Sequence, residues 1–469
     1  MVWENCLTRL LNKNYIVLNV VAFCAAFVCY FSMYGFRKPF TASTYKGLKL
    51  WGVNFKIMLV TAQAIGYTLS KFIGIKVISE LNQARRGFWV IIFISMAELS
   101  LILFGATPAP YNIIWMFMNG LPLGMIWGLV FSYLEGRRTS EILGCGMAVS
   151  FIVSSGIVKS IGKALLNAGV SQWWMPAAVG AIFFTPLVLS TLVLESVPDP
   201  NEDDIASRTE RVQMSGKDRT RFFLTFWPGL ILWVLFMVLL TAYRDFRDNF
   251  APELWEQWGY SEAPGIYSVS EIIVACVICI PIGLFMLIKK HLNTLIAYHI
   301  LIAGGLIVTL ICTIICDSGK MSGVVWMVIT GIGLYLGYIP FNSIMFDCFL
   351  SAFKYRANTG FLMYICDASG YLSSIAILFV KNFATPNLSW ASFFMKLSYY
   401  MTIINTAVIA LALAYYLIKY KVYVSEDDVD SSGKKEPLDE DEKDVSIGDS
   451  PSAEDEQKSS SSENKKELL

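Results

Sequence analysis

The first residues that could do chemistry are an arginine and a lysine side by side at the end of an apolar stretch. Arg37 and Lys38 lie in "MYGFRKPFTAS", after an apolar run from Tyr15 through Gly35. A charged side chain inside a membrane is costly unless it faces a cavity or a partner. A guanidinium offers a planar fork of donors that matches pairs of phosphate or carboxylate oxygens. The pair therefore indicates an anion-binding position; the alternative is that both side chains reach the headgroup layer.

A second arginine occupies a comparable place later in the chain. Arg244 lies in "AYRDFRDNF", in the first apolar span of the second half, as Arg37 lies in that of the first half. A pseudo-two-fold axis would bring the two guanidiniums to opposite sides of one cavity, where they could clamp a phosphate. Lys38 and Lys71 would add point charges, and Glu271 is a further candidate for the binding set.

Other charges in the predicted spans are candidates for ion pairs or proton coupling. Arg244, Arg247 and Asp248 lie within about one helical turn, so ion pairs of the arginines with the carboxylate there are the alternative to a clamp. The two histidines, His291 and His299, lie in a loop and early in a span. A carboxylate would therefore have to carry any coupled proton. The candidates for coupling or ion pairing are Glu98, Arg247, Asp248, Asp347 and Asp367.

These charges are set in a chain that is mostly membrane-spanning. Its 469 residues are 55% hydrophobic and 16% charged, whereas a soluble domain has about 25% charged residues. Apolar runs of about 20 residues recur along the whole length, which is the signal for transmembrane helices. We predict an all-α membrane protein whose twelve spans lie near residues 15–42, 55–78, 88–105, 111–134, 142–166, 173–195, 223–248, 264–288, 293–316, 323–350, 357–381 and 390–418.

The predicted spans divide into two groups of six. "GLPLG" from Gly120 and "GLYLG" from Gly333 occupy matching places, and each is followed by a basic loop and a Ser-Gly pair. This pattern indicates an internal repeat, and six plus six helices with a linker between them is the architecture of major facilitator transporters. The predicted parts are an N-terminal bundle (1–196), a cytoplasmic linker (197–222), a C-terminal bundle (223–424) and an acidic tail (425–469).

Loop charges predict the orientation and the partners. Seventeen lysines and arginines lie on the side of the termini, against five on the other side: Lys46, Lys49, Lys56, Lys320 and Lys381. Both termini are therefore expected to be cytoplasmic. The serine-rich acidic tail is expected to be disordered, with a kinase as a candidate partner. No basic stripe, nucleophile–base pair or metal-ligand cluster is evident, so we expect a lipid bilayer and a small solute as partners, and no nucleic acid, enzyme activity, cofactor or metal.

At these charges the sequence resembles the organophosphate:phosphate antiporters of the major facilitator superfamily. Arg37 and Lys38 look like that family's pair at the end of helix 1. "GYTLSKF" from Gly66 is similar to a helix 2 pattern of the family and places Lys71 on its lysine. "YGFRKPFTAS" followed by "SKFIGIKVISEL" is closer still to an uncharacterised group of bacterial membrane proteins of the same superfamily.

The resemblance extends to the second half, with one departure. Arg244 precedes Pro252 by eight residues, as an arginine on helix 7 does in the antiporters, and a family glutamate on helix 8 falls on Glu271. A histidine that the family carries on helix 5 aligns with Phe151. This departure leaves the substrate and the coupling mode open.

The resemblance implies a secondary transporter that works by alternating access. We expect it to exchange a small organic anion, such as a phosphorylated metabolite, for phosphate, with Arg37 and Arg244 as the clamp. Exchange has a physical reason, since two unneutralised guanidiniums would resist closure of an empty cavity. Two alternatives stay open: a proton-coupled transporter of a carboxylate or zwitterion, and a non-transporting sensor or receptor with a transporter fold.

Overall fold

The structure is a computed structural model of the chain. It describes residues 8, 11, 14–80, 85–134, 137, 139–199, 202, 204, 216–285, 287–288, 290–355 and 359–432. The chain forms two compact units, Met1–Lys421 and Val422–Leu469, and the membrane body is the first of them. The part of the predicted acidic tail from residue 433 onward lies outside the described part of the chain.

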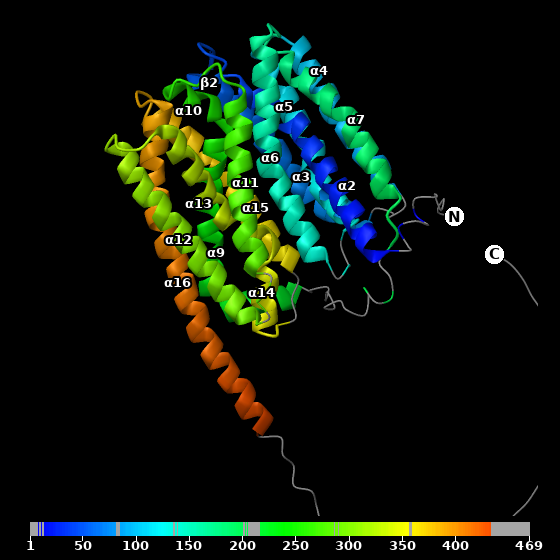
Figure 1. Ribbon diagram of the computed structural model, residues 1–469, viewed down its shortest axis with the longest axis vertical. Helices are drawn as coiled ribbons and strands as arrows, with labels where there is room; N and C mark the ends of the chain where they lie inside the picture. The colour runs from blue at the N-terminus through cyan, green and yellow to red at the C-terminus, as the bar shows by residue number, and fades with distance from the viewer. Residues whose placement is uncertain are drawn as a thin grey trace, which may run out of the picture. The chain divides into compact units, whose positions relative to one another are not determined.

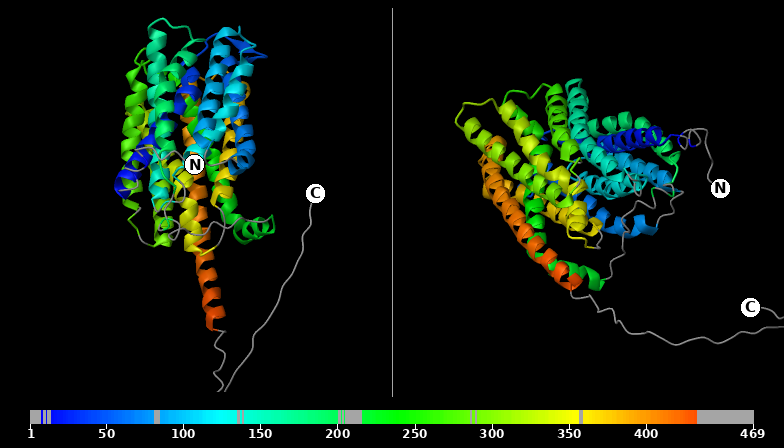
Figure 2. Two further views of the ribbon diagram at one scale, coloured as in Figure 1. Left: turned by 90° about the vertical axis from the view of Figure 1, so that its right-hand side faces the viewer. Right: turned by 60° about the horizontal axis from the view of Figure 1, so that its bottom comes forward.

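Long helices that run side by side make up the membrane body (Figures 1 and 2). In the first half they are α2 (Tyr15–Arg37), α3 (Phe55–Glu80), α4 (Arg86–Ala106), α5 (Ile113–Phe131), α6 (Ser140–Asn167) and α7 (Met175–Glu195). In the second half they are α9 (Gly216–Asn249), α11 (Gly265–Phe285), α12 (His291–Asp317), α13 (Gly323–Ser343), α15 (Thr359–Phe379) and α16 (Trp390–Ser432). The short helices α10 (Ala251–Gln257) and α14 (Met345–Ala352) follow α9 and α13.

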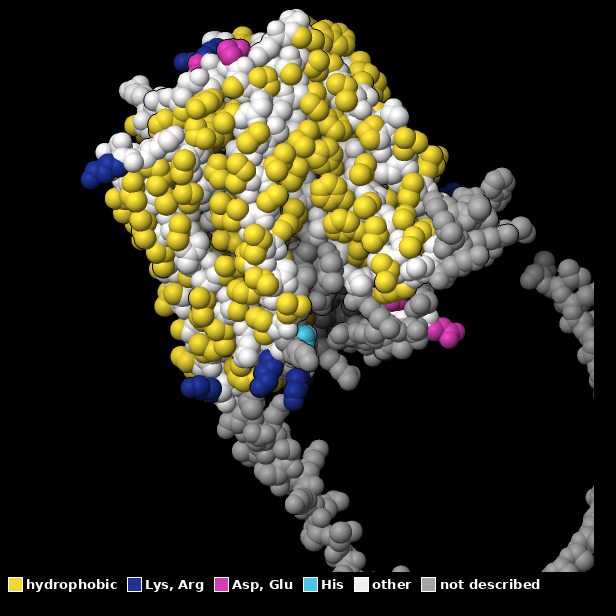
Figure 3. Space-filling model, viewed as in Figure 1, with side chains coloured by type: hydrophobic (Ala, Val, Ile, Leu, Met, Phe, Trp, Pro, Cys, Tyr) yellow, Lys and Arg dark blue, Asp and Glu magenta, His cyan; other side chains and the backbone are white. Residues whose placement is uncertain are grey.

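The expectation of an all-α membrane protein is confirmed. Within the described residues, eleven helices are long and apolar enough to cross a membrane, and α15 covers the predicted span 357–381. Hydrophobic side chains cover the flank of the bundle, whereas lysines and arginines gather at its ends (Figure 3). This distribution is what a surrounding bilayer requires.

Two predicted spans are interrupted. The span 15–42 ends its α-helix at Arg37, and residues Pro39–Ala42 form a 3₁₀ turn, because Pro39 has no N–H for the next helical hydrogen bond. The span 323–350 breaks at Ile344, one turn after Pro340, which divides it into α13 and α14.

Two other helix ends differ from the prediction. α9 begins at Gly216 rather than at residue 223, and α16 continues to Ser432, into the segment expected to be disordered from residue 425. Extending an existing helix adds one hydrogen bond per residue and needs no new nucleus, so polar residues at a helix end can remain helical.

A small β-hairpin that the sequence did not predict joins η1 (Pro39–Ala42) to α3. Its strands, β1 (Lys49–Leu50) and β2 (Val53–Asn54), are antiparallel, with Leu50 opposite Val53. The two turn residues, Trp51 and Gly52, both have positive φ angles, as a tight turn of the mirror-image type requires. The hairpin and α10 lie at the same end of the bundle, which we call the α10 end (Figure 1).

The two halves meet along a few helices. α6 packs on α11 and α13, and α3 packs on α15. Gly156 makes the first contact possible, because a Cβ there would lie 2.5 Å from the carbonyl oxygen of Tyr267 and 2.9 Å from Cβ of Glu271. The centre of the body is therefore lined by both halves.

Candidate functional site

A small cavity between the two halves is lined by two of the predicted site residues, Arg37 and Lys38. It has about 20 Å³ of space open to water-sized molecules, whereas sites for small molecules typically measure about 300–1,000 Å³. In this conformation the cavity is too small for a metabolite. Its lining residues lie on α2, α3, α9 and α15, and at Lys38 between α2 and η1. They include Arg37, Lys38, Gln63, Tyr67, Asp245, Asn249, Tyr371 and Ser374.

Arg37 is held by aromatic side chains. Its guanidinium carbon lies 3.9 Å from the centre of the Tyr67 ring, and its Nη2 donates a hydrogen bond of 3.3 Å to the hydroxyl of Tyr371. The side chain is buried, and no carboxylate of the described residues pairs with it. The Nζ of Lys71 lies 5.2 and 5.1 Å from the same two rings. The structure thus brings Arg37 and Lys71 to one tyrosine-lined wall.

Lys38 is bound to the second half. Its Nζ lies 2.5 Å from Oδ2 of Asp248 and donates a 2.7 Å hydrogen bond to Oδ1 of Asn249. Asp248 also accepts from Lys159 and from the hydroxyl of Ser155, both on α6. One carboxylate therefore joins two lysines of the first half. Lys38 does not reach the headgroup layer, because its side chain is buried in this cluster.

Arg244 and Arg247 each have a carboxylate partner. Arg244 donates to Oδ1 of Asp245 from Nη2 at 2.6 Å and from Nε at 3.1 Å, and Arg247 donates from Nη1 to Oε1 of Glu271 at 2.7 Å. The predicted ion pair of Arg244 with Asp248 on one helical turn is wrong, because Asp248 forms ion pairs with two lysines of the first half.

A serine and a tyrosine complete the surroundings of Arg244. The hydroxyl of Ser374 donates a 2.8 Å hydrogen bond to Asp245, and the guanidinium of Arg244 lies 3.8 Å from the centre of the Tyr338 ring. The adjacent Asp245, the tyrosines and Ser374 were not among the predicted site residues. The sequence held one signal for Tyr67, which lies one turn before Lys71 in "GYTLSKF".

Three predicted candidates lie elsewhere or outside the described side chains. Glu98 lies on α4 against Gly180 of α7, inside the first half, and its buried Oε2 has no hydrogen-bond partner. Asp347 lies on α14, at the end of the bundle opposite the α10 end (Figure 1). The side chain of Asp367, on α15, is not described.

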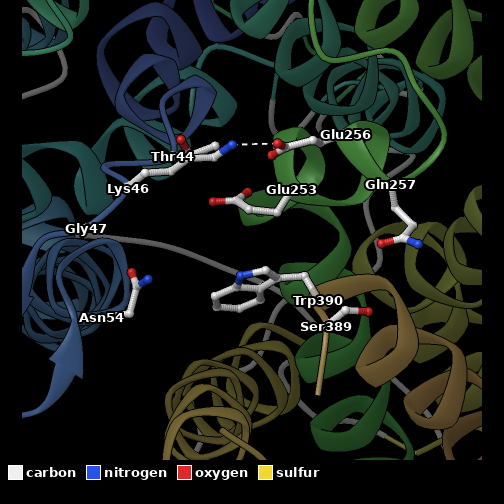
Figure 4. A pocket seen from close by; sticks show the side chains of 9 residues that line it. All are labelled: Thr44, Lys46, Gly47, Asn54, Glu253, Glu256, Gln257, Ser389 and Trp390. Carbon is white, nitrogen blue, oxygen red and sulfur yellow. Dashed lines mark hydrogen bonds and ion pairs between the residues drawn. The ribbon is translucent and has the colours of Figure 1, made fainter. Parts of the chain in front are cut away.

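A larger pocket opens at the α10 end. It measures about 500 Å³ and is lined by both halves, from Thr44, Lys46 and Asn54 to Glu256 and Trp390 (Figure 4). Lys46 and Glu256 form an ion pair of 2.5 Å across its rim, and both side chains are exposed.

A buried ion pair joins the two halves beside this pocket. Nζ of Lys56 lies 2.7 and 2.8 Å from the two oxygens of Glu253 and also donates to the carbonyl oxygen of Thr41 at 2.9 Å. The prediction that Lys56 is a loop lysine is wrong: α3 begins at Phe55, and the side chain of Lys56 is fully buried.

The ion pairs that the described residues form between the halves at the α10 end all have their positive charge on the same half. In each of them a lysine of the first half meets a carboxylate of the second. We call this set the lysine–carboxylate seam, and its pairs are Lys38–Asp248, Lys159–Asp248, Lys46–Glu256, Lys56–Glu253 and Lys163–Glu262. The seam links the two halves at the α10 end of the body.

Solved structures of transporters share this fold. A D-xylose–proton symporter has a TM-score of 0.58 and 15% identity, covering 86% of this chain and 97% of its own. A bacterial homologue of the human lysosomal transporter Spinster, inward-facing and unoccupied, has a TM-score of 0.57 and 10% identity, covering 87% and 98%. The nucleoside transporter NupG has a TM-score of 0.56 and 16% identity, covering 84% and 98%. The chain therefore has the fold of major facilitator transporters.

Sequence comparison places the chain in a family but does not assign a substrate. No curated protein matches it, so the resemblance to the organophosphate:phosphate antiporters rests on the motifs around Arg37, Lys71 and Arg244. The family of unknown function DUF5690 matches residues 39–419, most of the membrane body. The chain belongs to the DUF5690 family.

Proposed function

We propose that this protein is a secondary transporter of a small organic anion, a phosphorylated metabolite that it exchanges for phosphate by alternating access. The fold supports a transporter. The proposal that the substrate is an anion rests on the buried guanidinium of Arg37. No described carboxylate neutralises this group, and it lines the cavity between the halves. A buried guanidinium gains most from a doubly charged ligand with paired oxygens.

The balance of charge around the cavity supports the same ligand class. Among the charged residues that line it, Arg37 and Lys38 are basic and Asp245 is acidic, so an entering anion meets an attractive field. Four further basic side chains and two further carboxylates belong to the ion pairs and ring contacts described above: Lys71, Lys159, Arg244 and Arg247, with Asp248 and Glu271.

The pairing of Arg244 changes the argument for exchange. Asp245 already neutralises one of the two guanidiniums of the clamp. The transporter without substrate therefore buries less uncompensated charge than it would with two unpaired arginines. In our proposal the anion first binds Arg37 and then draws Arg244 away from Asp245. Exchange is therefore expected to be faster than net transport by a modest factor, and net transport is expected to be measurable.

Phosphate flux in proteoliposomes tests the proposal. Purified protein is reconstituted into vesicles loaded with phosphate or with chloride alone, and uptake of labelled phosphate is compared. We expect uptake in both, faster in the phosphate-loaded vesicles, and inhibition by sugar phosphates and glycerol phosphate. Uptake that ignores these phosphates and is inhibited by simple carboxylates instead would reject the phosphorylated substrate.

A proton-coupled transporter of a carboxylate or zwitterion is the second candidate. One observation favours it: Oε2 of Glu271 is buried and has no hydrogen-bond partner, so this carboxylate has an oxygen available to hold a proton. Uptake driven by an imposed pH gradient and abolished in Glu271→Gln would support this candidate. Uptake that is independent of the gradient would exclude it.

A further inference from the structure

The end of α2 leaves backbone carbonyl groups without their usual donors. The last α-helical hydrogen bond runs from the N–H of Lys38 to the carbonyl oxygen of Tyr34, at 3.0 Å. Pro39 has no N–H, and the N–H of Thr41 bonds to Lys38 rather than to Arg37. An unsatisfied carbonyl inside a membrane protein is expensive, because no bulk water is present to replace the missing donor.

Two buried amide side chains supply the missing donors. Nε2 of Gln63, on α3, donates to the carbonyl oxygen of Arg37 at 2.9 Å and to Oδ1 of Asn119 at 2.8 Å. Nδ2 of Asn119, on α5, donates to the carbonyl oxygens of Phe36 at 3.2 Å and Ala97 at 3.1 Å. Asn119 is fully buried and Gln63 is 7% exposed. Together these amides cap the C-terminal end of α2 in place of backbone N–H groups.

The helices that carry the amides are themselves held at a fixed spacing. Gly66 of α3 faces the backbone carbonyl of Phe117, and Gly120 of α5 faces that of Gln63, so closely that a Cβ at either position would overlap the opposite helix. α3 and α5 therefore cannot shift far relative to each other. Their amides present a fixed frame to the end of α2.

We propose that Gln63 and Asn119 are positioning residues for Arg37. They hold the carbonyl groups at and just before this residue, so they set the rotation of the last turn of α2 and with it the direction of the guanidinium toward Tyr67. Asn119 is not part of the cavity lining, so it acts on the cavity through the end of α2 and through Gln63, whose amide it holds. The role in transport rests on the proposed anion site, whereas the positioning of residue 37 does not.

The first experiment measures coupling between Asn119 and Arg37. Phosphate uptake in proteoliposomes is compared for Asn119→Leu, Arg37→Ala and the double variant. Asn119→Leu removes the three buried hydrogen bonds of this side chain and is expected to raise KM for phosphate about tenfold. In the Arg37→Ala background the same substitution should change KM by less than about twofold. Additive effects, or an unchanged KM in folded Asn119→Leu, would overturn the proposal.

A matched control separates positioning from general loss of stability. Asn112 is also fully buried and donates through Nδ2 to a backbone carbonyl, that of Phe104, at 3.4 Å. Asn112→Leu removes one buried hydrogen bond and should lower the melting temperature, though by less than Asn119→Leu, and it should leave KM for phosphate unchanged. An equal rise of KM in Asn112→Leu would mean that Asn119 is merely structural.

A readout without any ligand keeps the inference independent of the proposed function. In a background without the ten native cysteines, Arg37→Cys is labelled with a soluble thiol reagent, alone and combined with Asn119→Leu or Asn112→Leu. We expect Asn119→Leu to change the labelling rate at least about fivefold and Asn112→Leu to leave it unchanged. Equal rates in all three would reject the positioning role, whereas altered rates without any phosphate uptake by the natural protein would reject only the anion site.

Discussion

The two halves of the body hold their central arginines in different ways. Arg37, on the first helix of the first half, has tyrosine rings around its guanidinium and amide side chains at its backbone. Arg244, on the corresponding helix of the second half, lies within a regular stretch of α9 and is paired with the adjacent Asp245. Symmetric positions in the sequence therefore do not mean equal electrostatic surroundings, because Arg37 has no carboxylate partner among the described residues and Arg244 is paired with a carboxylate of its own helix.

The largest expected effect follows from replacing Arg37. Arg37→Ala should raise KM for phosphate about 100-fold, corresponding to roughly 3 kcal/mol for a buried charge-assisted contact. Arg37→Lys keeps the charge but loses the planar fork, so it should recover only part of the affinity. The measurement is the concentration dependence of phosphate uptake. If both variants transport like the natural protein, Arg37 is not the anion site.

An effect of similar size is expected at Arg244, and it should appear mainly in stability. Arg244→Ala leaves Asp245 buried without its cation, which should cost about 3 kcal/mol of unfolding free energy. The double variant Arg244→Ala/Asp245→Asn removes the orphaned charge and should recover most of that loss.

Thermal unfolding in detergent distinguishes these outcomes. A double variant that is no more stable than Arg244→Ala would show that Asp245 does not depend on Arg244. In that case the contrast between the two arginines would have to be abandoned.

The smallest effects are expected in the lysine–carboxylate seam, where burial decides the outcome. Lys56→Met leaves Glu253 buried and should destabilise the protein by about 2–3 kcal/mol, with partial recovery in Lys56→Met/Glu253→Gln. Lys46→Ala breaks the exposed pair with Glu256 and should change stability by less than about 0.5 kcal/mol. Unfolding curves of the three variants test this order, and equal losses for Lys46 and Lys56 would contradict it.

Much of the fold could be read from the sequence because membrane helices have a local signal. An apolar run of sufficient length is visible without knowing its neighbours, so each predicted span matches a helix of the body. The predicted spans 15–42 and 323–350 run through Pro39 and Pro340, the prolines beside the interruptions after Arg37 and at Ile344. The hairpin at residues 49–54 was missed because two residues per strand are too few for a periodic pattern.

The candidate site could be read only in part. Charged residues stand out in an apolar sequence, which is why Arg37, Lys38, Lys71 and Arg244 could be predicted as site candidates. Glu98 was found by the same rule, yet it lies inside the first half and not at the cavity. The rule detects a charge whose burial in the membrane would be costly without a partner or a cavity. It does not show whether the side chain faces the cavity between the halves.

The sequence by itself determined which helices form and which charges they carry into the membrane, since both depend on neighbouring residues along the chain. Only the tertiary structure decided how those charges are matched. Lys38 and Asp248 are 210 residues apart, and Gln63 and Asn119 reach the end of α2 from two other helices. Such partners are chosen by the packing of helices against each other, where a buried charge or carbonyl takes the nearest group that satisfies it.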